Sequence, residues 1–187
     1  MSNRPFTAKF PRYPENGDEV FIRGKLKDDA KSFSVNFCLP RPAQVAEHQT
    51  PPYIALHFKT IYDERDDTSR VVLNWKNLQW QQEEVLDNYW HVDRSQTFRV
   101  VFRLHEDCIK VFVNSVDHPP DYQFPVQLPL DQIESIELWD DVEHVEEISF
   151  RYDNGNLLRP TIARTPTYAP CDLRNEMLLW KCLTVPS

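Results

Sequence analysis

Four residues whose side chains could together hold a ligand lie between positions 57 and 85 of this chain of 187 residues. They are His57, Asn74, Trp80 and Glu83, which supply an imidazole, an amide, an indole ring and a carboxylate. Groups of this kind donate or accept hydrogen bonds and stack on apolar surfaces, so they are suited to holding a ligand. Nucleophilic catalysis needs a base beside a Ser or Cys, and no Ser/His or Cys/His pairing of that kind stands out. We therefore expect a binding protein and no enzyme.

A second group of polar residues is acidic: Asp140, Asp141, Glu143, Glu146 and Glu147. A glycosidase centre would need two of these carboxyl groups to face each other across a substrate cleft. A run of charges more often forms a solvated face, and we predict that structure here.

Apolar and polar residues alternate with a period of two along much of the chain, which predicts β-strands. These strands would position the polar groups named above. In the segment 54–58 the side chains of Ile54, Leu56 and Phe58 point into a core. His57, Lys59 and Ile61 then fall on the opposite, exposed face. Alternation also marks 33–37, 98–102 and 109–113, with 105–107 as a hairpin turn, and late strands are expected at 136–138 and 148–150. Many short strands without helical periods predict an all-β antiparallel sandwich or barrel.

Composition supports this fold class and narrows the partners. The chain has 15 Pro, only 3 Gly and 12% aromatic residues, which fits a β-rich fold. Three scattered glycines cannot build a phosphate-cradling loop. A net charge of -8 argues against nucleic acid as the main partner, because neutralising phosphates dominates such affinity.

The sequence predicts a cytoplasmic protein, with unconventional secretion left open. The first residues lack the apolar core of a signal peptide, and no stretch approaches the roughly 20 apolar residues of a membrane span. Cys38, Cys108, Cys171 and Cys182 are widely spaced and are expected as free thiols in a reducing compartment. None of the four has the two-residue spacing typical of a zinc or redox motif, and we expect neither a metal nor a cofactor.

Several motifs resemble those of the galectin family. Residues 109–115, IKVFVNS, are similar to the family's "FKVxVNG" strand, with Ser115 where Gly is usual. Residues 133–142, IESIELWDDV, resemble its late "IxxLxIxGDV" element, and 21–26 with 30–37 look like its first strands. The resemblance covers about residues 16–152. It implies a galectin-like jelly-roll sandwich of two antiparallel sheets, with sugar bound on the concave sheet.

The resemblance also assigns roles to the four residues between 57 and 85. It gives His57 a sugar hydroxyl, Asn74 a second polar contact, Trp80 the stacking platform and Glu83 an acceptor role. A galactoside needs oriented donors and acceptors for its axial hydroxyl and a ring for its apolar face. Taken one at a time, each of the four is also compatible with an ordinary structural role, as a surface His, a covering Trp, a turn Asn or a loop Glu.

Three further positions of the family signature are substituted. Lys59 replaces an Asn, while Ile61 and Val85 each replace an Arg. Hydrogen bonds to charged groups contribute about 1.5–3 kcal/mol each, so two lost arginines forfeit about 3–6 kcal/mol. A micromolar site has only about -8.2 kcal/mol in total. The predicted carbohydrate site is thus altered and weak or lost, with Lys59 favouring anionic glycans over neutral ones.

The alternative function is a sugar-independent protein–protein interaction module on the same fold. It would use the concave sheet or the C-terminal segment to hold a protein partner, and a homodimer is left open. Trp75 and Trp90 are two further tryptophans that could build a different stacking surface or belong to the core.

The sequence predicts three parts: an N-terminal extension at 1–15, a galectin-like domain at 16–152 and a C-terminal extension at 153–187. Prolines punctuate the last part and argue against further strands there. Residues 172–180 have the pattern of a short helix with Leu173, Met177 and Trp180 on one face. Packing of this face on the sandwich is favoured, with docking onto a partner as the alternative.

Overall fold

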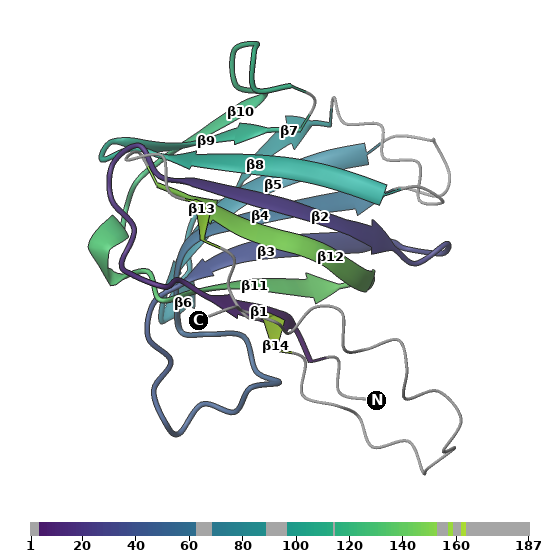
Figure 1. Ribbon diagram of the computed structural model, residues 1–187. Helices are drawn as coiled ribbons and strands as arrows, with labels where there is room; N and C mark the ends of the chain where they lie inside the picture. The colour runs from purple at the N-terminus through teal and green to yellow at the C-terminus, as the bar shows by residue number, and fades with distance from the viewer. Residues whose placement is uncertain are drawn as a thin grey trace, which may run out of the picture.

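The computed structural model shows two antiparallel sheets packed face to face (Figure 1). It describes residues 4–62, 69–88, 97–113 and 115–152, together with the backbone of 157–158 and 162–163. The larger sheet contains β1 (Phe6–Lys9), β3 (Ser32–Cys38), β4 (Tyr53–Tyr62), β5 (Ser69–Asn77), β6 (Gln79–Trp80), β7 (Glu84–Asp87), β11 (Ser135–Asp140) and β14 (Ile162–Ala163). The smaller contains β2 (Glu19–Leu26), β8 (Thr97–Leu104), β9 (Cys108–Phe112), β10 (Tyr122–Pro125), β12 (Val142–Arg151) and β13 (Leu157–Leu158).

The strand order combines hairpins of successive strands with connections that cross between the two sheets. The eight-stranded sheet runs β14-β1-β11-β3-β4-β5-β6, with β7 also paired to β5, and the six-stranded sheet runs β10-β9-β8-β2-β12-β13. Successive strands such as β2 and β3, or β11 and β12, lie in different sheets. This arrangement confirms the predicted all-β sandwich of two antiparallel sheets. Within the described residues the helical structure consists of a single 3₁₀ turn, η1 (Leu130–Gln132).

Aromatic residues from both sheets fill the space between them. The ring of Phe33 on β3 lies 4.8 Å from that of Phe98 on β8, and Phe37 lies 4.9 Å from Phe102. Phe58 on β4 contacts Phe102 edge-on at 5.7 Å. All five rings are at most 2% exposed. Burying a large apolar side chain contributes about 1.5–3 kcal/mol, so this cluster stabilises the pairing of the sheets that carries the site.

The predicted strands form with the predicted faces. In β4 the side chains of His57, Lys59 and Ile61 are half-buried, and they alternate with Phe58 and others that are fully buried. The hairpin expected at 105–107 joins β8 to β9. Alternation therefore places His57 on the outward face of the eight-stranded sheet, as the pleat of a strand requires.

Both ends of the chain contribute to the sheets. The stretch assigned to an N-terminal extension supplies β1, which pairs with β11. After Tyr152, β13 pairs with β12 and β14 pairs with β1. The expectation that prolines keep the C-terminal segment from adding strands is therefore wrong for these two short strands. The helix expected at 172–180 lies outside the described residues, as do Trp90, Cys171 and Cys182, and the three-part division of the chain stays a prediction.

Candidate functional site

A row of four polar residues crosses the outward face of the eight-stranded sheet. Strand register places Glu137 of β11 opposite Asn36 of β3, Asn36 opposite His57 of β4, and His57 opposite Asn74 of β5. Glu137, Asn36 and Asn74 are only 4%, 2% and 5% exposed, so the row is a buried polar seam in the floor of this face. Buried polar groups of this kind must hydrogen-bond, and their partners fix their orientation.

His57 is oriented by its neighbour in the row. Its Nδ1 lies 2.6 Å from Asn36 Oδ1, which can only accept, so Nδ1 carries the proton and donates it. Burial, helped by the nearby Lys59 and Lys76, lowers the pKa of His57 to about 3. The imidazole is therefore neutral at physiological pH, and its Nε2 presents a lone pair. This nitrogen can accept a hydrogen bond from a ligand hydroxyl.

Trp80 supplies an apolar surface beside this acceptor. Its ring centroid lies 4.7 Å from that of His57, and its side chain is 44% exposed. The ammonium nitrogen of Lys76 lies 5.2 Å from the centroid of the indole ring. An exposed ring next to an oriented acceptor can stack on the C–H face of a ligand while a hydroxyl of the same ligand reaches His57.

Asn74 holds the loop that presents Trp80. Its Nδ2 donates to the backbone oxygen of Gln81 at 3.1 Å, and its Oδ1 accepts from the backbone nitrogen of Trp75 at 2.7 Å. Residue 78 at the tight turn before β6 is Leu78, which has a φ of 63° and donates its backbone N–H to Pro52 at 2.8 Å. The amide of Asn74 thus positions the β5–β6 connection. Its role as a ligand contact stays a prediction.

The structure does not bring Glu83 into this network. Glu83 lies in the connection between β6 and β7, is exposed, and makes no side-chain hydrogen bond or ion pair to any residue in the described part of the chain. Its role as an acceptor for a sugar hydroxyl stays a prediction.

The three substituted positions lie on the same face as His57. Lys59 forms an ion pair with Asp140 of β11, with 3.1 Å between Nζ and Oδ2. Ile61 is half-buried, and Val85 of β7 is 48% exposed opposite Val72. Neither Ile61 nor Val85 can donate a side-chain hydrogen bond, and the charge of Lys59 is directed toward β11.

Sequence reasoning missed the residues that support the row from the β11 side. Arg41 Nη2 binds Glu137 Oε1 at 2.7 Å, while its Nη1 donates to the backbone oxygens of Ala46 and Gln49 at 2.9 and 2.6 Å. Trp139 Nε1 donates to the other Glu137 oxygen at 2.9 Å. No local pattern could have found them, because Arg41 and Glu137 are almost a hundred positions apart and meet only in the finished sheet.

The acidic run forms ion pairs rather than a catalytic cleft. Glu143 pairs with Lys25 at 3.1 Å and Glu146 with Arg23 at 2.9 Å. For Asp141, burial opposes ionisation, but hydrogen bonds from the backbone of residues 31 and 32 and from Lys27 outweigh it and lower the pKa. Within the described ranges no group of three or more His, Cys, Asp or Glu residues could hold a metal ion.

The sandwich thus presents a His and a Trp side by side on one sheet. A family model described as galactoside-binding lectin matches residues 5–150. The chain belongs to this family, and the predicted membership of the galectins is confirmed.

Curated relatives agree with this assignment. Mouse galectin-6 is 24% identical over 89% of this chain, and rat galectin-4 is 27% identical over 78%. The chain spans 51% and 41% of the length of these two relatives. Human galectin-7 is 29% identical over 76% of this chain and 95% of its own length.

Solved structures share the fold. Xenopus laevis galectin-Ib has a TM-score of 0.61 and 22% identity, covering 79% of this chain and 99% of its own. A toad ovary galectin in complex with thio-digalactose also has a TM-score of 0.61, with 21% identity and coverage of 79% and 98%. The homodimeric agglutinin CG-16 from chicken liver has a TM-score of 0.58, with 21% identity and coverage of 79% and 99%.

Proposed function

We propose that this chain is a carbohydrate-binding domain whose galactoside-type site is altered and weak. The observation that carries the proposal is the His57–Trp80 pair, with ring centroids 4.7 Å apart and the imidazole fixed by Asn36. A sugar ring seated on Trp80 would give a hydroxyl hydrogen to His57 Nε2. The site binds and does not catalyse, because it offers neither a nucleophile with a base nor two facing carboxyl groups.

The weakness of the site comes from the residues around this pair. Ile61 and Val85 stand where the family uses arginine, so two charge-assisted hydrogen bonds of about 1.5–3 kcal/mol each are lost. Lys59 does not replace them, since its ammonium is engaged by Asp140 at 3.1 Å. A lysine is also a single point of charge and does not reproduce the planar guanidinium fork. Lactose affinity near or beyond millimolar is the expected result.

Anionic glycans are the preferred class within this proposal. Lys76 stands 5.2 Å from the centroid of the Trp80 ring, whereas Lys59 on the same face is held by Asp140 at 3.1 Å, so Lys76 supplies the positive charge in this proposal. Burial lowers the pKa of Lys76, yet a sulfate or carboxylate on the sugar would favour its charged form. Calorimetric titration with lactose and with its sulfated derivative tests this point. The sulfated sugar should bind more tightly, with an advantage that shrinks as salt is added. Equal affinities at low salt would contradict it.

A matched pair of variants tests whether binding occurs at this site. Trp80→Ala removes the stacking surface and should abolish any measurable titration with either sugar. Tyr13→Ala serves as the control, because Tyr13 is also an exposed aromatic residue, at 59%, but lies outside the row. If Trp80→Ala binds sulfated lactose as well as the parent does, the glycan would have to bind elsewhere.

The second candidate function is sugar-independent recognition of a protein by the same face. Leu78, Trp80 and Val85 are 60%, 44% and 48% exposed, and all three lie on β6, β7 or the turn before them. Exposed large apolar residues grouped on one edge are typical of interaction sites. A glycan array with no signal above background, together with a cytosolic partner whose binding is lost in Trp80→Ala, would favour this function.

Self-association and location complete the proposal. The chicken liver agglutinin is homodimeric, and we extend a homodimer to this chain only as a proposal. Sedimentation velocity over a concentration series measures it directly.

A cytoplasmic location is proposed from the sequence. In the part of the chain that the structure describes, no helix is both long enough and apolar enough to cross a membrane.

A further inference from the structure

The six-stranded sheet carries an apolar row on its outward face, on the opposite side of the sandwich from His57. Outward positions of β2, β8 and β9 are polar or charged except at Phe21, Val101 and Phe112 and at the buried Cys108 where β9 begins. Strand register aligns the first three residues, with Phe21 opposite Val101 and Val101 opposite Phe112. These three apolar exceptions form one cross-strand row, in which Phe21 is half-buried while Val101 and Phe112 are 8% and 4% exposed.

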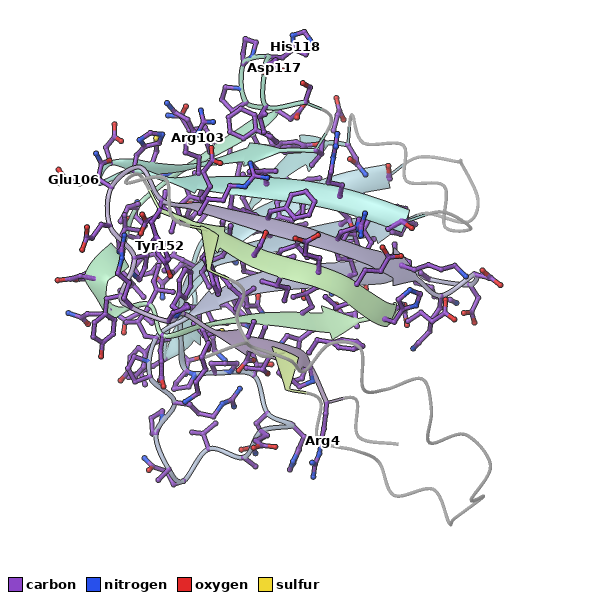
Figure 2. All side chains as sticks on the ribbon, viewed as in Figure 1. Arg4, Arg103, Glu106, Asp117, His118 and Tyr152 are labelled. Carbon is purple, nitrogen blue, oxygen red and sulfur yellow. The ribbon has the colours of Figure 1, made fainter. Side chains whose placement is uncertain are left out.

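The row is the floor of a hollow of about 200 Å³. The segment after β9 forms one wall through Ser115, Val116 and Asp117, and Val116 is 43% exposed. Figure 2 shows Asp117 and His118 at the tip of this segment, standing out beyond the strands. A space of this volume holds one or two side chains of a bound segment and is too small for a folded domain.

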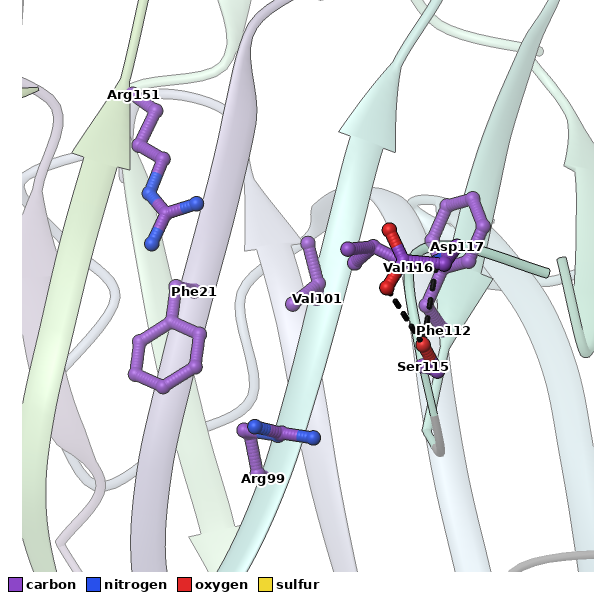
Figure 3. A pocket seen from close by; sticks show the side chains of 8 residues that line it. All are labelled: Phe21, Arg99, Val101, Phe112, Ser115, Val116, Asp117 and Arg151. Carbon is purple, nitrogen blue, oxygen red and sulfur yellow. Dashed lines mark hydrogen bonds between the residues drawn. The ribbon is translucent and has the colours of Figure 1, made fainter.

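Two arginines stand beside the floor. Figure 3 shows Arg151 of β12 above the row formed by Phe21 and Val101, and Arg99 of β8 below it, so the two arginines flank the row on opposite sides. Arg151 has a side chain that is 58% exposed, and its contact with Glu19 is a long one, at 4.0 Å. Glu19 is already bound by Arg103 at 2.6 Å, so it only partly neutralises Arg151.

The charge of the hollow is opposite to that of the whole chain. Two guanidinium groups and one carboxylate line it, and the Asp117 carboxylate accepts a hydrogen bond from Ser115 Oγ at 3.5 Å. The chain as a whole carries a net charge of -8. A cationic border around an apolar floor is complementary to an apolar group flanked by acidic groups. Such a border selects both the sign of the ligand's charge and the orientation of the ligand.

We propose that this hollow binds an acidic peptide segment of a partner protein. One apolar side chain of the segment lies on Phe21, Val101 and Phe112, and neighbouring carboxylates contact Arg99 and Arg151. A glycan or free phosphate would satisfy the arginines but leave the apolar floor uncovered, so a peptide fits the whole surface better. The site lies on the other sheet and is independent of the glycan site.

Fluorescence anisotropy with a short labelled peptide tests the proposal on the full chain. The probe has a central Leu-Phe pair with two glutamates on each side, and the matched peptide has glutamines instead. The glutamate peptide should bind and weaken with salt, and the glutamine peptide should bind at least about tenfold more weakly. Equal binding of the two peptides, or no binding of the glutamate peptide at low salt, would overturn the proposal.

Substitutions then locate the binding. Arg99→Glu with Arg151→Glu should weaken binding of the glutamate peptide at least about tenfold, because each substitution turns attraction into repulsion. Val116→Asp should act in the same direction through the wall. Arg23→Glu is the control: Arg23 is on the same face of β2 but pairs with Glu146 at 2.9 Å and does not line the hollow. An equal loss in the control, or no loss in the double variant, would place the peptide elsewhere.

Two other occupants give distinct results, and either would overturn the proposal. If a second copy of the chain fills the hollow, the double variant should reduce self-association in sedimentation velocity while the peptide fails to bind the parent. If residues 164–187 of the same chain fill it, the glutamate peptide should bind only after their deletion. The expected result is peptide binding to the full chain that this deletion does not change.

Discussion

At the scale of single residues, the proposed glycan site depends on a neutral histidine held in one tautomer. The amide oxygen of Asn36 accepts a hydrogen bond from His57 Nδ1–H, which leaves Nε2 as an acceptor next to the Trp80 ring. The sequence predicted that His57 and Trp80 belong to one site, from alternation and the family motif, and the structure places their ring centroids 4.7 Å apart. It could not identify Asn36, because an asparagine inside a strand has no signature until the register sets it opposite His57.

The protonation of His57 provides a direct test of this environment. Burial and the two nearby lysines hold its pKa at about 3, against an unfolded value of 6.5. The unfolded chain therefore binds more protons between these two pH values, and the contribution of His57 to stability is lost as pH falls from 6.5 toward 3. Imidazole NMR shifts should show no titration of His57 above about pH 4, because the ring stays neutral there. A midpoint near that of a free histidine would refute the buried, neutral state.

At the scale of elements, the face that carries the site is anchored from both sides. The β5–β6 connection is held by Asn74, and the loop after β3 is held by Arg41. The strands themselves were predictable, since β3, β4, β8 and β9 all follow a period of two. The loop that binds to Glu137 was not, because ion pairs between residues almost a hundred positions apart depend on the finished sheet.

The Arg41–Glu137 pair should contribute far more to stability than a surface pair. Its side chains are 19% and 5% exposed, and Arg41→Ala leaves a buried carboxylate without its cation. We expect a loss of about 2–4 kcal/mol in the free energy of unfolding. Lys9→Ala is the control, since the Lys9–Glu134 pair has a similar length of 2.8 Å but is exposed. It should change stability by less than about 1 kcal/mol in urea unfolding. Similar effects of the two substitutions would contradict the assignment.

Gly24 fixes the contact between β2 and the bulge in β12. A Cβ at this position would lie 2.7 Å from the backbone oxygen of His144 and 3.0 Å from the ring of Phe98. Backbone cannot yield as a flexible side chain does, so Gly24→Ala should lower the free energy of unfolding by about 1–3 kcal/mol. Thermal unfolding followed by circular dichroism measures this change. An unchanged or raised melting temperature would show that β12 shifts without cost.

At the scale of the whole molecule, the sequence predicted the sandwich because many local patterns point to the same fold. Alternation, proline and glycine content and family motifs agree along most of the chain. The two short strands after residue 152 were not expected, because their pairing partners, β12 and β1, are set by the finished sheets and not by local pattern. Proline content indicates the local backbone preference of a segment. It does not predict whether a strand at the edge of a sheet is available to pair with that segment.

Deleting residues 153–187 tests the contribution of that segment to the molecule. The deletion removes β13 and β14, which pair with the edges of both sheets. Exposed edges and lost packing should lower the melting temperature and increase the binding of a hydrophobic dye. A shorter deletion, of residues 164–187 alone, retains both strands. The difference between the two deletions therefore gives the contribution of β13 and β14. If both deletions leave the melt and the dye signal unchanged, the segment does not stabilise the sandwich.

The central claim is that the glycan site is intact in its frame and weak because two guanidinium groups are missing. Lactose titration of the triple variant Lys59→Asn, Ile61→Arg and Val85→Arg tests it most directly, with the parent protein and Trp80→Ala in the triple background measured beside it. Restoring two charge-assisted hydrogen bonds contributes about 3–6 kcal/mol. Calorimetry should therefore show lactose affinity at least about a hundredfold above that of the parent, and lost again without Trp80. A folded triple variant that binds lactose no better than the parent, or a parent that already binds at micromolar concentration, would contradict the account.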